Sequence, residues 1–98
     1  MAEKKKKIDI LSNELRIGVE IYRANEERKE PIYFTSLTDR MKTVLSRSTI
    51  SKSIDILFDL GMLRADWEMV NGNWARTLKI ANEAKSFFKK LSDEVENV

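Results

Sequence analysis

The chain has 98 residues, of which 42% are hydrophobic and 35% are charged, and its formal net charge is +2. These values are typical of one small folded domain, whose core is marginal without a partner chain. Because the sequence contains neither cysteine nor histidine, disulfides, thiolate or imidazole metal sites and the catalytic chemistry of both side chains are excluded. No glycine-rich phosphate loop is present either, so we expect no enzyme, no cofactor and no metal site.

The N-terminus carries a basic run from Lys4 to Lys7. The segment Ile8–Glu14 after it is too polar for a signal peptide, and no later run has the length of a membrane span. We therefore expect residues 1–7 to be a flexible, solvated tail that adds at most nonspecific phosphate contacts. Residues 8–98 are expected to form one domain of a cytoplasmic protein that does not bind membranes.

A helical period runs from Ile8 to about Ala24, and it carries two neighbouring apolar stripes where one core contact needs only one. The first stripe consists of Ile8, Leu11, Leu15, Val19 and Tyr22, and the second of Ile10, Ile17 and Ile21. We interpret the second stripe as a surplus that a second chain covers. A charged loop closed by Pro31 and a short extended segment, Ile32–Phe34, follow this helix.

Two short helical patterns meet at a tight corner between Thr35 and Gly61. Thr35 or Ser36 is expected to cap the first helix, and Leu37 and Met41 lie one turn apart on its buried face. Ser46 supplies the N-cap of the second helix, which extends to about residue 60. In that helix, Ile50, Ile54 and Leu57 have core-facing spacing, and Gly61 is available as a left-handed C-terminal cap.

The first two turns of the second helix carry small hydroxyl and basic side chains. From Arg40 to Ile54 there are four cations and no carboxylate, which gives +4 within a chain of only +2. This charge favours a helix that enters the DNA major groove over one whose hydroxyls only cap and whose cations are only solvated. The predicted DNA-binding residues of this region are Arg40, Lys42, Ser46, Arg47, Ser48, Thr49, Ser51 and Lys52.

After Gly61 the period changes to the alternation of a β-hairpin, with Asn71-Gly72 as its turn. A turn there pairs Leu63 with Ile80, Ala65 with Leu78, Trp67 with Arg76 and Met69 with Trp74, all on one face. Arg64, Asp66, Glu68, Ala75, Thr77 and Lys79 fall on the other face.

A β-ribbon directly after such a helix is typical of a wing, here residues 63–80. We expect Arg76 to stack over the ring of Trp67, while the role of Trp74 stays open. Asn73 and Arg76 are predicted to contact the DNA backbone or minor groove.

Asn82 is expected to cap a last helix with apolar positions at Ala84, Phe87, Phe88, Leu91 and Val95. Because both terminal helices carry apolar surface, we expect them to pack across a two-fold axis. The predicted dimer interface consists of Ile10, Ile17, Ile21, Phe87, Phe88, Leu91 and Val95.

The resulting fold class is mainly α with a small β-hairpin, in the order helix, strand, helix, helix, hairpin, helix. From about Leu15 to Leu91 the chain resembles the winged helix-turn-helix transcription regulators of the MarR, PadR and ArsR type. The resemblance is strongest in the segment Leu45–Leu63, which looks like their recognition helix and the glycine before the wing. The wing lacks the Asp-x-Arg-Arg signature of MarR proteins, and the ligands of ArsR metal sensors are missing.

The resemblance implies a dimeric regulator, a repressor or an activator, that binds specific double-stranded DNA sequences. Nothing in the sequence indicates a small-molecule effector, for which only the dimer interface or a cleft beside the first helix has room. The alternative is a protein-interaction module of a multi-subunit transcription or replication assembly. That alternative is favoured by Ile56, Phe58 and Leu60, which lie outside the core stripe.

Overall fold

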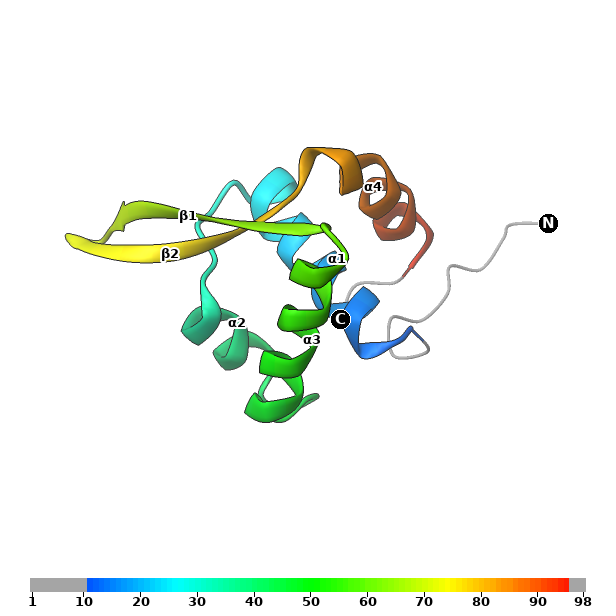
Figure 1. The fold of residues 1–98 in the computed structure, drawn as a ribbon, viewed down its shortest axis with the longest axis horizontal. Coiled ribbons are helices and arrows are strands. Elements are labelled where there is room, and N and C mark those ends of the chain that lie inside the picture. Colours follow the sequence, from blue (N-terminus) through cyan, green and yellow to red (C-terminus); the bar gives the residue numbers. More distant parts are fainter. Residues whose placement is uncertain (1–10, 96–98) are drawn as a thin grey trace.

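The structure is a computed structural model that describes residues 11–95. Its elements are α1 (Asn13–Tyr22), the π-helical turn η2 (Arg23–Glu27), α2 (Phe34–Met41), α3 (Arg47–Asp59), β1 (Leu63–Val70), β2 (Asn73–Ile80), the 3-10 turn η3 (Asn82–Ala84) and α4 (Lys85–Glu94). Helices α2 and α3 form a helix-turn-helix, and the antiparallel hairpin β1–β2, here called the wing, projects beyond the helices (Figure 1). The predicted α+β winged-helix architecture is confirmed. The tail 1–7, Ile8 and Ile10 lie outside the described residues.

Helix α1 is the element on which the core is built. It begins after Ser12, whose hydroxyl accepts a hydrogen bond from the Leu15 N–H at 3.2 Å. Helices α3 and α4 and strand β2 all pack against it. Gly18 lets α4 approach closely, because a Cβ atom there would overlap the ring of Phe88.

The prediction that α1 and α4 keep surplus apolar surface outside the core of one chain is wrong for most of the residues concerned. Ile17, Ile21, Phe88 and Val95 are buried within the single chain. The reason is that α1 contacts three elements at once, so more than one of its faces is covered. Of the predicted interface residues between 11 and 95, only Phe87 is well exposed, at 46%, and Leu91 is half-buried.

After α1 the chain stays helical into the segment that was predicted to be a charged loop, and this continuation is the π-helical turn η2. Arg23 at its start is buried, and its guanidinium donates to the Ser92 Oγ at 2.8 Å and to the Ser92 carbonyl at 2.9 Å. It also reaches the Val95 carbonyl at 3.4 Å. A basic side chain thus satisfies carbonyl groups at the end of α4, which the helix itself leaves without partners.

The predicted extended segment before the helix-turn-helix is present, but it is shorter than expected. Leu78 donates its N–H to the Ile32 carbonyl at 2.7 Å, and Tyr33 forms an isolated β-bridge with Thr77. Phe34 already belongs to α2.

The start of α2 therefore differs from the prediction of a cap at Thr35 or Ser36. Tyr33 is the N-cap, because extended pairing ends there and the helix follows at once. The Ser36 hydroxyl accepts from the Tyr33 N–H at 2.9 Å, so it acts from within the first turn. In contrast, the predicted ends of α3 are confirmed: the Ser46 hydroxyl accepts from the Thr49 N–H at 3.2 Å, and Gly61 has φ +72°.

The wing has the predicted register throughout, from Leu63 opposite Ile80 to Met69 opposite Trp74. Asn71 and Gly72 have φ values of 50° and 84°, as a two-residue hairpin turn of this type needs. Burial follows the register only at the base of the wing, where Leu63, Leu78 and Ile80 are buried. Further out on the same face, Trp67, Met69 and Trp74 are exposed, because the hairpin extends past the elements that would cover them (Figure 1).

The predicted cap at Asn82 is wrong. Asn82 opens the 3-10 turn that precedes α4, and neither the turn nor α4 has a side-chain cap. Backbone bonds shape this corner: Ala84 donates to the Ala81 carbonyl, and Ala81 donates to the Met62 carbonyl, both at 2.9 Å. Among residues 11–95, no helix is both long and apolar enough to cross a bilayer.

Candidate nucleic-acid interface

The orientation of α3 follows from its buried face. Ile50, Ile54 and Leu57 enter the core, and Ser53 lies between them with its hydroxyl donating to Glu14 Oε2 of α1 at 3.0 Å. The first two turns consequently expose a stripe of cations and hydroxyls. This stripe, called the α3 reading stripe below, consists of Arg47, Ser48, Ser51 and Lys52.

Two of the predicted DNA-binding residues are engaged in the helix cap. The Ser46 hydroxyl accepts from the Thr49 N–H and donates to Thr49 Oγ1 at 2.9 Å. Ser48 keeps only a 3.3 Å contact to Ser46, and the Ser51 hydroxyl is exposed. Ser46 and Thr49 therefore hold the first turn in shape, while Ser48 and Ser51 remain available for a ligand.

The predicted cations differ in how they are held. The Arg47 guanidinium lies 5.0 Å from the centroid of the Phe34 ring, a cation–π contact between α3 and α2. Within residues 11–95, neither Lys42, Arg47 nor Lys52 forms a salt bridge. All three side chains are exposed, so their charge faces solvent.

Arg40, in contrast, is tied to α1. Its Nε lies 2.8 Å from Glu20 Oε2, and its Nη1 lies 3.6 Å from Glu30 Oε1. The same Glu20 oxygen also holds the Arg28 guanidinium at 2.6 Å. Arg40 is therefore less available to DNA than the cations of α3.

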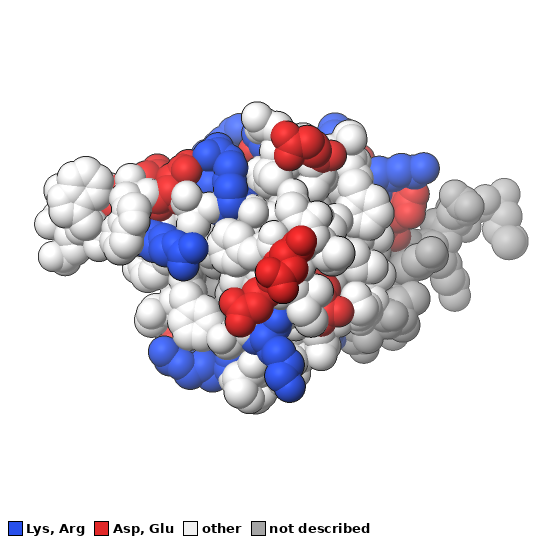
Figure 2. All heavy atoms as spheres, in the orientation of Figure 1, with Lys and Arg blue, Asp and Glu red and all other residues white. Residues whose placement is uncertain are grey.

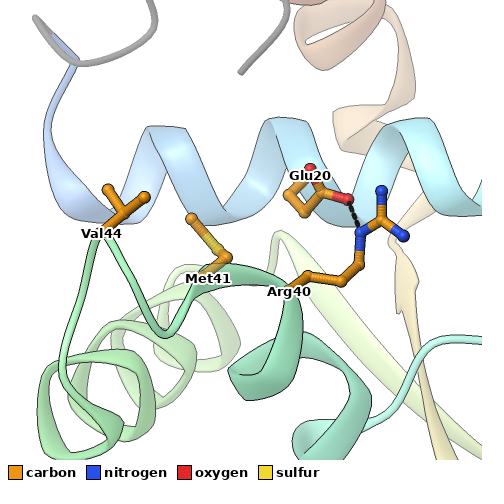
Figure 3. Close-up of a pocket in the computed structure, with 4 residues that line it drawn as sticks. All are labelled: Glu20, Arg40, Met41 and Val44. Atoms are coloured by element: carbon orange, nitrogen blue, oxygen red, sulfur yellow. Dashed lines mark hydrogen bonds and ion pairs between the residues drawn. The ribbon is translucent and has the colours of Figure 1, made fainter.

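The Glu20–Arg40 pair borders a hollow of about 330 Å³ between α1 and α2, which Met41 and Val44 also line (Figure 3). This hollow lies beside the first helix, in the region where an effector was expected to have room. Its carboxylate and guanidinium already bind each other, so its lining favours neither a cationic nor an anionic ligand.

The basic surface of α3 ends abruptly after its second turn. Asp55 and Asp59 are exposed on the later turns of the same helix, at helical spacing from Lys52. In Figure 2, acidic side chains lie over the middle of the face that α3 occupies in Figure 1, and basic ones lie below them. Only the first two turns of α3 therefore suit a polyanion.

On the wing, Arg76 does not stack over Trp67 as predicted. Its guanidinium lies 5.3 Å from the centroid of the Phe58 ring, which belongs to α3. The end of α3 thus offers Arg76 an aromatic ring that sequence alternation within the hairpin could not reveal. Asn73 is exposed at the first position of β2, beside the turn.

The carboxylates of the wing lie on its other face and are paired there. Arg64 holds Asp66 at 2.9 Å, and Lys79 holds Glu68 at 3.1 Å. The Thr77 hydroxyl also donates to Glu68, and this bond, together with Lys79, lowers the pKa of Glu68 below its usual value. The face that carries Arg76 has no acidic residue from Leu63 to Ile80.

Sequence reasoning missed the exposed cluster on that face. Trp67, Met69 and Trp74 expose 69%, 56% and 67% of their surface. The alternating pattern predicted their shared face correctly, but it gave no information on where the covering elements end. The only usable signal was that the apolar stripe continues up to the turn.

The chain is similar to a solved structure, the crystal structure of the circadian clock associated protein Pex from Anabaena. The two share 20% sequence identity with a TM-score of 0.62, over 85% of this chain and 76% of that chain. No family model matches the chain, and no curated protein matches it. At this level of identity the likeness concerns the fold alone. With the element order above, it shows that the chain has a winged-helix fold.

Proposed function

We propose that the protein binds double-stranded DNA and regulates transcription, with the start of α3 in the major groove and the wing on the adjacent backbone or minor groove. The observation that carries the proposal is the α3 reading stripe, in which cations and free hydroxyls face solvent on the first two turns of a helix-turn-helix. Arg47 can bind a guanine edge or a phosphate, and small Ser48 and Ser51 let the helix backbone approach the bases. The similarity to Pex supports the fold on which this geometry depends.

We further propose that the protein acts as a dimer, through a smaller surface than the sequence suggested. Phe87 is exposed and Leu91 is half-buried on α4, and both remain available to a second chain. A two-fold axis at this surface would present two α3 helices to successive major grooves, about 34 Å apart, and would match a palindromic site. Such symmetry is common among regulators that read inverted half-sites.

The second candidate is a protein-interaction module, and the later half of α3 favours it. Ile56 and Leu60 expose 40% and 64% of their surface, one turn apart and next to Asp55 and Asp59. Apolar residues rimmed by charge are typical of protein interaction sites. This surface lies past the α3 reading stripe, so variants of the two surfaces can separate the functions.

The test starts with selection of bound sequences from random duplex DNA, followed by affinity measurements on the selected site. Arg47→Ala is expected to weaken specific binding by roughly 1 to 3 kcal/mol, because it removes a base or phosphate contact. Lys52→Ala should weaken binding to all sequences. It should also reduce the slope of log affinity against log salt concentration by about the amount that one phosphate contact contributes. Lys90→Ala is the matched control, because it removes an exposed cation from α4 and leaves α3 intact.

Two results would contradict DNA reading by α3. One is a double variant, Arg47→Ala with Lys52→Ala, that binds the selected site as tightly as the parent. The other is an affinity that does not change with salt. If no duplex is selected, and Leu60→Ser abolishes capture of a specific protein partner, the interaction module is the correct assignment.

A further inference from the structure

The outer half of the wing exposes an unusually large apolar surface for a solvated hairpin. Trp67, Met69 and Trp74, here called the apolar wing face, each expose more than half of their surface. They lie at neighbouring positions of the register, with Met69 opposite Trp74 and Trp67 opposite Arg76. Large exposed apolar patches in folded proteins mark binding sites.

Charge indicates what kind of molecule fits this face. The carboxylates of the wing, Asp66 and Glu68, lie on the opposite face and are paired with cations. Arg76 borders the apolar wing face and rests on Phe58 of α3, so the face is continuous with the helix that carries the α3 reading stripe. Within residues 11–95 Arg76 forms no salt bridge. Aromatic rings beside such a cation are complementary to a nucleic-acid strand, which offers bases and phosphates together.

The geometry further favours an unpaired base over an intact duplex. Inside a duplex the flat faces of the bases are covered by their neighbours, so an indole gains little there beyond contact with sugars. In the register, Trp67 and Trp74 are diagonal neighbours, whose Cα atoms typically lie about 7 to 8 Å apart. Among the described aromatic residues only Phe87 and Phe88 form a ring pair, so the two indoles do not stack on each other.

We propose that the apolar wing face binds an unpaired nucleobase by stacking, so that the protein prefers duplex DNA that carries an extrahelical or single-stranded base beside the site held by α3. The inference rests on the proposed DNA binding and specifies its substrate. Extruding a base from an intact duplex costs a few kcal/mol, whereas a base that is already unpaired avoids this cost. The preference thus comes from the DNA as well as from the wing.

The experiment compares three DNAs of one sequence: an intact duplex, the same duplex with one unpaired base, and the single strand. Affinity is measured by anisotropy of labelled DNA. The chain contains 2 tryptophans, both on the wing, so intrinsic tryptophan fluorescence reports this face alone. The parent should bind the duplex with the unpaired base about 5- to 150-fold more tightly than the intact duplex, the range that corresponds to stacking of one base. Its tryptophan emission should be quenched more strongly by that DNA.

Four variants complete the design. Trp67→Ala and Trp74→Ala should lower affinity for the duplex with the unpaired base much more than affinity for the intact duplex, so the preference is lost. Trp67→Phe and Trp74→Phe should restore most of the preference. Both substituted positions are exposed in the parent, and thermal unfolding of each of the four variants verifies its fold.

The outcomes separate this inference from the proposed function. Equal affinity of the parent for both duplexes would overturn the inference and leave duplex binding intact. Alanine variants that lose the same factor on both duplexes would also overturn it, because the face would then lie on an ordinary groove or backbone. Binding to the single strand alone, dependent on the tryptophans, would support the stacking face and overturn duplex reading by α3. Binding to none of the DNAs would overturn both.

Discussion

Tyr22 shows how a single buried side chain makes the stability of this fold depend on pH. Its ring is buried at the end of α1, as part of the core. Burial raises the pKa of the phenol above its ordinary value of 10.0; the nearby Lys89 opposes this shift, and Glu26 and Glu27 add to it. The folded state therefore keeps a proton that the unfolded chain releases in alkaline solution.

From this we expect an alkaline loss of stability that Tyr22→Phe removes. The folded pKa is the higher one, so the contribution of Tyr22 is complete below pH 10 and is lost as the pH rises through the folded pKa. Denaturant unfolding of parent and variant between pH 8 and 12 measures the difference. Lysine titration affects both proteins alike, so only the difference between them reports Tyr22. Parallel curves over this range would show that the phenol is equally solvated in both states.

At the scale of elements, the contact between α1 and α4 sets the shape of the core. The ring of Phe88 occupies the space over Gly18 that any other residue would fill with its side chain. Glycine lowers the helix propensity of α1 by roughly 0.5 to 1 kcal/mol relative to alanine. Close packing of the ring must outweigh this cost.

Gly18→Ala tests which of the two effects is larger. Propensity alone predicts stabilisation, whereas overpacking in a dense core costs typically 1 to 3 kcal/mol. We expect net destabilisation, measured as a lower denaturant midpoint with an unchanged slope. Adding Phe88→Leu to Gly18→Ala should recover part of the loss, because the smaller side chain leaves room for the methyl group. A Gly18→Ala protein more stable than the parent would show that α4 can move away from α1 at little cost.

Elements with local signals were predictable from the sequence. Asn71-Gly72 determines the register of the wing through its backbone conformation, and Ser46 begins α3 because its hydroxyl reaches the first turn. The prediction of a cap at Asn82 failed because backbone hydrogen bonds close that corner, and such bonds do not depend on residue type. Likewise, Arg23 at the start of the π-helical turn donates to Ser92, 69 residues away, a contact that local sequence cannot reveal.

The sequence predicted which residue types form the candidate site. It predicted only in part which of these side chains are free to bind a ligand. Arg47 and Lys52 are exposed as expected, because the positions of Ile50, Ile54 and Leu57 determine which side of α3 faces solvent. The ion pair of Arg40 with Glu20 and the stacking of Arg76 on Phe58 join elements that are distant in sequence. Local charge and alternation carry no information on such contacts.

At the scale of the whole molecule, adjacent residues of α4 are expected to have opposite roles. Phe88 is buried against α1, while Phe87 is 46% exposed and meets it edge to face with centroids 5.1 Å apart. Phe87→Glu should therefore leave the fold intact and convert the proposed dimer to a monomer with weaker binding to a palindromic site. Phe88→Glu should unfold the chain, because it buries an unpaired charge. Sedimentation and circular dichroism of both variants measure these outcomes. A parent protein that stays monomeric at high concentration would remove the dimer from the proposal.

The short pairing of Ile32 and Tyr33 with β2 has a mechanical consequence. Leu78 of β2 bonds to Ile32, and Tyr33 is both the bridge partner of Thr77 and the last residue before α2. The hairpin and the helix-turn-helix are therefore anchored to one stretch of main chain, and neither can tilt without straining the other. If such a rigid protein binds a duplex, the DNA has to bend and the protein does not. Base-pair steps with a low bending energy would then be favoured between the contacts of α3 and those of the wing, although no side chain touches these steps.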